Sequence, residues 1–388
     1  MKNSLNLSDV TRAVCLPALV GGVLLLASGV AQAETIGLVL TTWHNSGTFT
    51  DDAKECAHGI NPDARENFRA QFKTKEEQDE AMRKYASAGY VLRGPNGESV
   101  NYSPWLVKDT LPWSDADAKV SKGLNLSGTL DGHATANTCT HKTFVSPEGE
   151  QGIDNQMYRS MGCIRGMRPG GTLDTFYLGE IASKTINRWV VEITGVDDAA
   201  NDDHVEVTLA QGQDKLVQDS TGKFVPGLTQ RMTTNKDYIA HTTGRIVDHV
   251  LITDAFPVVR MPTEQLDEPA EWEFKDFRLK VKLTDTGATG VLGGYQDIQK
   301  FYRLFAKVVG QHHVSMGASP PSAYESLLRN ADGFKDPATG QCTALSSAYD
   351  VDFVRAFIVR EPDEKNHIAA APQPSVKGAP NTRLALKN

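Results

Sequence analysis

The chain has few cysteines, no excess of basic charge and none of the short motifs that identify common enzyme classes. Its 388 residues include 40 Lys and Arg against 48 Asp and Glu, a net charge of −8. Nucleic-acid binding needs clustered basic residues that replace counterions, so this balance argues against a nucleic-acid partner. The GxxxxGK[ST] phosphate loop, the GxGxxG dinucleotide turn, the HExxH zinc helix and the GxSxG elbow are also missing. Function therefore has to be argued from smaller features.

Long apolar runs are confined to the N-terminus. Lys2 and Arg12 precede an apolar stretch over residues 13–30, which ends in Ala31-Gln32-Ala33. This is the three-part pattern of a secretory signal peptide, and we expect cleavage after Ala33. The alternative is a retained membrane anchor, which the glycines and the proline within the stretch disfavour. We expect an exported protein, periplasmic or secreted, with no membrane span in its mature chain.

One of the five cysteines, Cys15, lies in the predicted leader. The mature chain keeps an even number, namely Cys56, Cys139, Cys163 and Cys342. An even number in an oxidising compartment predicts two disulfides. Four cysteines allow three pairings and the sequence does not choose among them, although Cys139–Cys163 is the favoured local bridge.

A metal site is the alternative use of these cysteines. Cys56-Ala57-His58 and Cys139-Thr140-His141 share C-x-H spacing, which places both side chains on one face of an extended backbone. If the cysteines are reduced, His58 and His141 complete a set of four ligands for a tetrahedral metal ion.

The mature chain divides into three stretches. Residues 34–170 are rich in turn-forming residues and hold three of the four cysteines. Residues 171–360 have the alternating pattern of β-structure. Residues 361–388 form a tail of Ala, Pro, Gly and Lys with few large apolar residues. We expect the tail to be disordered.

The clearest strand runs from Phe277 to Leu283, where four apolar residues alternate with three basic ones. Such alternation indicates a strand with one buried and one wet face. Residues 189–193 and 204–209 alternate similarly and predict a hairpin. Trp272 and Phe274 are out of phase with Phe277, which indicates a β-bulge near residues 275–276.

Helical patterns interrupt the predicted strands at about residues 295–309 and 321–330. Strands with one wet face, joined by turn-rich connections, are typical of antiparallel sandwiches. The sequence therefore predicts a mainly β fold. We expect an antiparallel β-sandwich-like core with helical insertions and a loop-rich, disulfide-stabilised N-terminal region.

Two loops are dense in side-chain oxygen atoms. In residues 146–156 the candidate polar or cation-binding residues are Glu150, Asp154 and Asn155. The alternative is that Asp and Asn bond to their own backbone and hold turns. The second loop is the candidate calcium site, with carboxylates at Asp197, Asp198, Asp202 and Asp203. Its alternative is a solvated hairpin tip, and we identify no other cofactor.

These features favour a protein that binds an extracytoplasmic ligand or protein, or has a structural role, without catalysis. The alternative is a secreted hydrolase that acts on an extracellular polymer through carboxylates the sequence does not identify. Two carboxyl groups facing each other across a cleft would favour the hydrolase.

Overall fold

The computed structural model describes residues 33–49, 52–86, 90, 93–183, 188–265 and 268–360. The predicted signal peptide, apart from its last residue, and the predicted disordered tail lie outside these ranges. All described residues belong to one compact unit, Ala33–Asn388. Within these ranges, no helix combines the length and the apolar character needed to cross a membrane.

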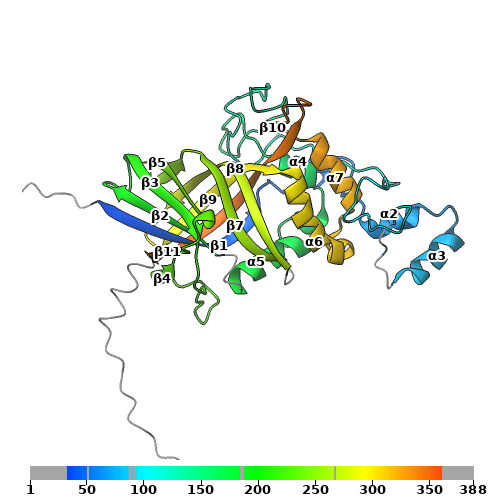
Figure 1. The fold of residues 1–388 in the computed structure, drawn as a ribbon, viewed down its shortest axis with the longest axis horizontal. Coiled ribbons are helices and arrows are strands. Elements are labelled where there is room, and N and C mark those ends of the chain that lie inside the picture. Colours follow the sequence, from blue (N-terminus) through cyan, green and yellow to red (C-terminus); the bar gives the residue numbers. More distant parts are fainter. Residues whose placement is uncertain are drawn as a thin grey trace, which may run out of the picture. The chain divides into compact units, whose positions relative to one another are not determined.

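Eight antiparallel strands form a closed barrel (Figure 1). In order around the barrel they are β1 (Glu34–Asn45), β2 (Trp189–Val196), β3 (Asp202–Gln211), β5 (Ile239–Val247), β6 (Val250–Thr253), β8 (Glu268–Leu283), β9 (Gly287–Asp297) and β11 (Cys342–Val359). Strand β1 closes the ring because it pairs on both sides: Leu38 lies opposite Val191 of β2 and opposite Arg355 of β11. The predicted β-sandwich is therefore wrong.

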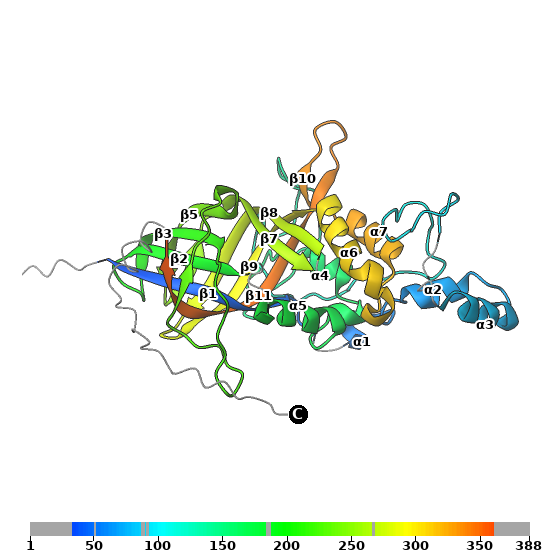
Figure 2. The same ribbon diagram turned by 60° about the horizontal axis from the view of Figure 1, so that its bottom comes forward.

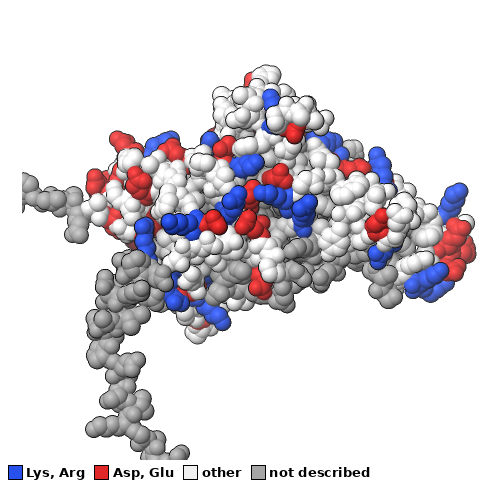
Figure 3. Space-filling model, viewed as in Figure 1, with Lys and Arg blue, Asp and Glu red and all other residues white. Residues whose placement is uncertain are grey.

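The error has a physical cause. Alternation of apolar and polar residues shows that a strand has one buried face, and strands of sandwiches and of barrels both meet that condition. The alternation itself is present in β8, where Leu279, Val281 and Leu283 are buried and Lys282 is exposed. Basic and acidic side chains cover the outer surface in this region (Figure 3). Only the pairing of β1 with β11 distinguishes the barrel.

The interior of the barrel is a packed apolar core. Its centre is aromatic: the ring of Trp43 lies 5.0 Å from Trp189 and 4.4 Å from Tyr349, measured between ring centroids. Trp272 and Phe274 stack beside them and are also buried. Aromatic rings bury large areas in such edge and offset contacts. The core therefore fills the barrel with side chains.

Three further strands lie off the ring: β4 (Leu228–Arg231) and β10 (Gly333–Lys335) pair with β11, and β7 (Phe256–Gln265) pairs with β8. The α-helices are α1 (Asp52–Glu55), α2 (Ala64–Ala70), α3 (Lys75–Lys84), α4 (Gln156–Met161), α5 (Thr172–Ser183), α6 (Ile298–Met316) and α7 (Pro320–Arg329). Helices α4, α6 and α7 gather at one end of the barrel (Figure 2). Helices α6 and α7 confirm the two helical patterns. Residues 93–155 form isolated bridges and turns between these elements.

Two disulfides link the loop-rich region, as the even number of cysteines predicts. They are Cys56–Cys163 and Cys139–Cys342. The predicted local bridge Cys139–Cys163 is wrong. The fold places Cys139 beside β10 and the start of β11: its backbone N–H donates to the backbone oxygen of Asp332, which directly precedes β10. All four sulfur atoms are bonded in pairs, so the predicted site with reduced cysteines does not form.

Candidate functional site

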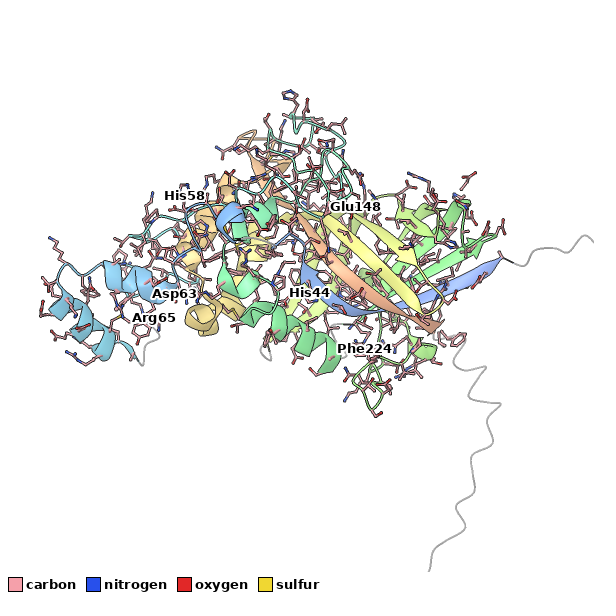
Figure 4. All side chains as sticks on the ribbon, turned by 180° about the vertical axis from the view of Figure 1, so that it is seen from behind. His44, His58, Asp63, Arg65, Glu148 and Phe224 are labelled. Carbon is pink, nitrogen blue, oxygen red and sulfur yellow. A yellow bond between two sulfur atoms is a disulfide. The ribbon has the colours of Figure 1, made fainter. Side chains whose placement is uncertain are left out.

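A cleft of about 480 Å³ lies outside the barrel. Its walls come from residues 113–117, residues 140–142, helix α4 and the C-terminal end of α7. His58, which follows α1, also lines it (Figure 4). The cleft therefore lies where the loop-rich region meets the helices that cover one end of the barrel.

Arg159 of α4 lines the cleft and is buried, at 8% exposure. Its Nε donates to Gln156 Oε1 at 3.0 Å, and its terminal nitrogens donate to the backbone oxygens of Ala116 and Lys142, both at 3.3 Å. The guanidinium lies 4.3 Å from the centre of the Phe144 ring. Burial lowers its pKa, although the charges of Asp115 and Asp117 oppose that effect.

The other charged groups of the cleft form its edge. Arg329 makes a bidentate ion pair with Asp115, at 2.6 and 3.0 Å. Burial would raise the pKa of Asp115, but Arg329 and Ser326 more than offset it and hold that pKa below its ordinary value. Lys142 and Asp117 are exposed. The permanent charges are thus three basic groups against two acidic ones, although the chain as a whole is acidic.

His141 lines the cleft and belongs to a buried cluster that lies behind it. The cluster consists of the His141 imidazole and the carboxylates of Asp154 and Asp332. His141 Nε2 is 2.7 Å from Asp154 Oδ1 and 3.9 Å from Asp332 Oδ2. The three side chains are 4%, 0% and 0% exposed. Their donor atoms lie within 4.8 Å of one another, so the cluster has the composition and the spacing of a metal site.

The atoms of these side chains that point away from the cluster are fixed by the backbone. His141 Nδ1 donates to the Cys139 carbonyl oxygen at 2.8 Å. Asp154 Oδ2 accepts from the N–H groups of Leu126 and Ser127, at 2.9 and 2.7 Å. Asp332 Oδ1 accepts from the Ser346 N–H at 2.7 Å, whereas its Oδ2 has no hydrogen-bond partner among the described residues.

The cluster shifts its own proton equilibria. Burial opposes the charging of His141, but the hydrogen bond to Asp154 and the charge of Asp332 prevail and raise its pKa to about 9. Burial raises the pKa of Asp332 to about 7, although the charge of His141 acts in the opposite direction. In the absence of another cation, a proton on His141 therefore balances part of the carboxylate charge at neutral pH.

Two residues from separate sequence-based hypotheses, His141 and Asp154, meet in this cluster. His58 does not join this cluster and lies at the cleft instead. The cysteines that the C-x-H hypothesis paired with it are in disulfides. Sequence reasoning missed Asp332, which precedes Gly333 and resembles an ordinary turn residue. Neither its spacing nor its neighbours signal burial.

The other residues of the loop 146–156 have separate partners. Glu150 forms an ion pair with Lys280 at 2.6 Å on the surface. Asn155 is fully buried and caps α4: its Oδ1 accepts from the Tyr158 N–H, and its amide donates to Ser46 O. Asn155 therefore holds the start of α4 and ties it to the end of β1.

The acidic loop connects β2 to β3, as predicted. Asp202 accepts hydrogen bonds from the backbone N–H groups of Asp197 and His204, at 2.7 and 3.0 Å. These bonds, the one from His204 first, lower the pKa of Asp202. Asp198 accepts from the Ala200 N–H at 2.8 Å. Backbone donors thus compete with any cation for these oxygens, and calcium binding here, with Asp203 as a further ligand, stays a prediction.

Comparison of the chain with protein-family models, with curated proteins and with solved structures finds no match in any of the three.

Proposed function

We propose that this is an exported binding protein whose cleft holds a small acidic ligand. Arg159 carries the proposal. It is a guanidinium at 8% exposure that contacts no carboxylate among the described residues, and neutral oxygens are its only hydrogen-bond acceptors. A buried cation without an anionic partner is costly. A carboxylate or phosphate group in the cleft would supply that partner through bidentate hydrogen bonds.

The rest of the cleft favours an acceptor as well. Trp113 lines it, and the buried indole Nε1–H has no acceptor among the described residues. Lys142 adds an exposed positive charge at the rim. Donors without acceptors match a ligand group that only accepts, as carboxylates and phosphates do. The flat indole of Trp113 can also pack against the carbon skeleton of an organic acid.

The cleft lacks the features that would favour a hydrolase. A glycoside hydrolase uses as its general acid a carboxyl group whose pKa is raised toward the working pH. Among the described residues, the carboxylates in the cleft lining are Asp115 and Asp117, two residues apart on one segment. Asp115 is held ionised by its pair with Arg329. Binding without catalysis therefore accounts better for these side chains.

Export to the periplasm or the medium is part of this proposal. The signal-peptide pattern supports it, and two disulfides are compatible with an oxidising compartment. Strand β1 starts at Glu34, so cleavage after Ala33 would leave the barrel complete. The intact mass of the exported protein tests this proposal; a mass that includes residues 1–33 would contradict it.

Ligand binding is tested by calorimetry of the purified mature protein with succinate, citrate, galacturonate, inorganic phosphate and sulfate. We expect one site for at least one of these acids, with binding that weakens as salt increases. Carboxylates and phosphate are separate arms of the test, because the guanidinium accepts both.

Arg159→Lys should weaken that binding by about tenfold or more, because lysine loses the planar bidentate donor. The matched control is Arg260→Lys on β7, where the exposed arginine pairs with Glu273. Equal affinities of Arg159→Lys and the unchanged protein, or no binding of any probe, would refute the proposal.

A further inference from the structure

We propose that His141, Asp154 and Asp332 form a binding site for a divalent transition metal, with Zn²⁺ as the ion that fits best. The ligand atoms are His141 Nε2, Asp154 Oδ1 and Asp332 Oδ2. This inference does not depend on the acidic ligand of the cleft, since the two carboxylates do not line the cleft.

Three acceptor atoms converge in this cluster. The Cys139 carbonyl oxygen can only accept, so His141 Nδ1 carries a hydrogen and Nε2 of the neutral ring presents a lone pair. That lone pair faces the two carboxylate oxygens. A proton on Nε2 can serve Asp154 at 2.7 Å but leaves Asp332 Oδ2, 3.9 Å away, without a partner. A metal ion would bind all three atoms at once.

Each ligand is already oriented from behind. Backbone N–H groups hold one oxygen of Asp154 and one of Asp332, and a backbone oxygen holds the imidazole. Ligating histidines and carboxylates in metalloproteins have such outer contacts, which fix the tautomer and aim the free atom. The disulfide Cys139–Cys342 also ties the His141 segment to β11. The site is thus pre-organised by covalent and backbone contacts.

The charge count also favours a divalent cation. A neutral imidazole with two carboxylates leaves two negative charges buried, and a divalent ion balances them fully.

The donor set selects the type of metal. Tetrahedral zinc with ligands at about 2.0–2.1 Å places two ligand atoms about 3.3 Å apart. The observed separations of 2.7 and 3.9 Å bracket that value, so small movements would complete the geometry. Calcium prefers six to eight oxygens, whereas here each carboxylate has one oxygen engaged by the backbone. The buried hydroxyl of Tyr295 also has no hydrogen-bond partner among the described residues.

The test is a zinc titration of the full mature protein after treatment with a chelator. We expect one equivalent of Zn²⁺ to bind and to raise the melting temperature. We also expect Co²⁺ to bind at the same site with the visible absorption of a four- or five-coordinate ion. Asp332→Asn should weaken zinc binding by more than about a hundredfold, more than loss of an outer contact usually costs.

Asp332→Asn is expected to fold, because it removes an unpartnered buried charge and keeps the acceptor for the Ser346 N–H. In chelator its melting temperature should equal or exceed that of the unchanged chain, whereas a purely structural carboxylate would lose stability. The matched control is His133→Gln, whose imidazole lies 3.3 Å from Asp131 but is exposed. Zinc affinity should not change in this control.

Two results would overturn the site. They are a folded protein that binds no stoichiometric zinc or cobalt, and an affinity that Asp332→Asn leaves unchanged. Either result would mean that the cluster is a buried ion pair between protonated His141 and the carboxylates, without a metal ion. Arg159→Lys should bind zinc normally, so loss of acidic-ligand binding and loss of metal binding are distinguishable.

Discussion

His44 of β1 donates a hydrogen bond from Nδ1 to Asp174 Oδ1 of α5 at 2.5 Å, and this contact joins the helix to the outside of the barrel. Asp174 is buried, and its other oxygen accepts from the Gly170 N–H at 2.9 Å. Asp350 and Asp352 of β11 add negative charge near the ring, while Lys122 pairs with Asp350. The hydrogen bond to Asp174 prevails over burial, so the pKa of His44 is raised above its usual range.

Stability should therefore depend on pH through His44. A raised pKa in the folded state means that the contribution is complete below the unfolded pKa of about 6.5. It is lost as the pH rises through the folded value. His44→Gln should lower the melting temperature most in mildly acidic buffer, with a difference that shrinks at alkaline pH. His133→Gln, on an exposed loop, is the control; a difference for His44→Gln that is independent of pH would contradict the prediction.

The two disulfides should contribute strongly to stability. They span 107 and 203 residues, and closing loops of that size contributes roughly 3–5 kcal/mol each in the chain-entropy account. Peptide mapping of the unreduced protein should find Cys56 with Cys163 and Cys139 with Cys342. Cys139→Ser with Cys342→Ser should lower the free energy of unfolding by about that amount in denaturant titration. A Cys139–Cys163 peptide would disprove the pairing.

The aromatic centre of the barrel should be sensitive to truncation. Phe274 is fully buried, with its ring centroid 5.2 Å from Phe277 and 6.0 Å from Tyr349. Phe274→Ala should cost about 3–5 kcal/mol of unfolding free energy, because the surrounding rings cannot close the cavity. Lys282→Ala, on the outer face of the same strand, should change it by less than about 0.5 kcal/mol. Similar losses for both variants would argue against a packed interior.

In the acidic loop between β2 and β3, the carboxylates are expected to bind backbone N–H groups rather than a calcium ion. Asp202→Ala removes two bonds to backbone N–H groups and should cost about 1 kcal/mol. We expect this loss to be equal in calcium and in chelator, as measured by thermal melts. A calcium-dependent rise in the melting temperature that Asp198→Ala and Asp202→Ala abolish would instead identify a calcium site.

Local features of this protein were predictable from its sequence. The alternation over Phe277–Leu283 appears as part of β8, and the hairpin of β2 and β3 forms as expected. The phase change before Phe277 is a β-bulge: the register with β9 shifts between Lys275 and Arg278, and Asp276 has a φ of 47°. These features depend on neighbours a few residues apart, where the geometry of the strand sets which side chains share a face.

Tertiary structure alone decided the closure of the barrel, the cysteine partners and the buried cluster. Leu38 meets Arg355, Cys139 meets Cys342, and His141 meets Asp332, all nearly two hundred residues or more apart in the chain. Periodicity shows that a residue is buried but not what it is buried against, because many pairings satisfy the same alternation. His141 and Asp154 could be selected as polar candidates from sequence. Their meeting with Asp332 required the pairing of β10 with β11, which brings a residue with no distinguishing local signal to the same buried point.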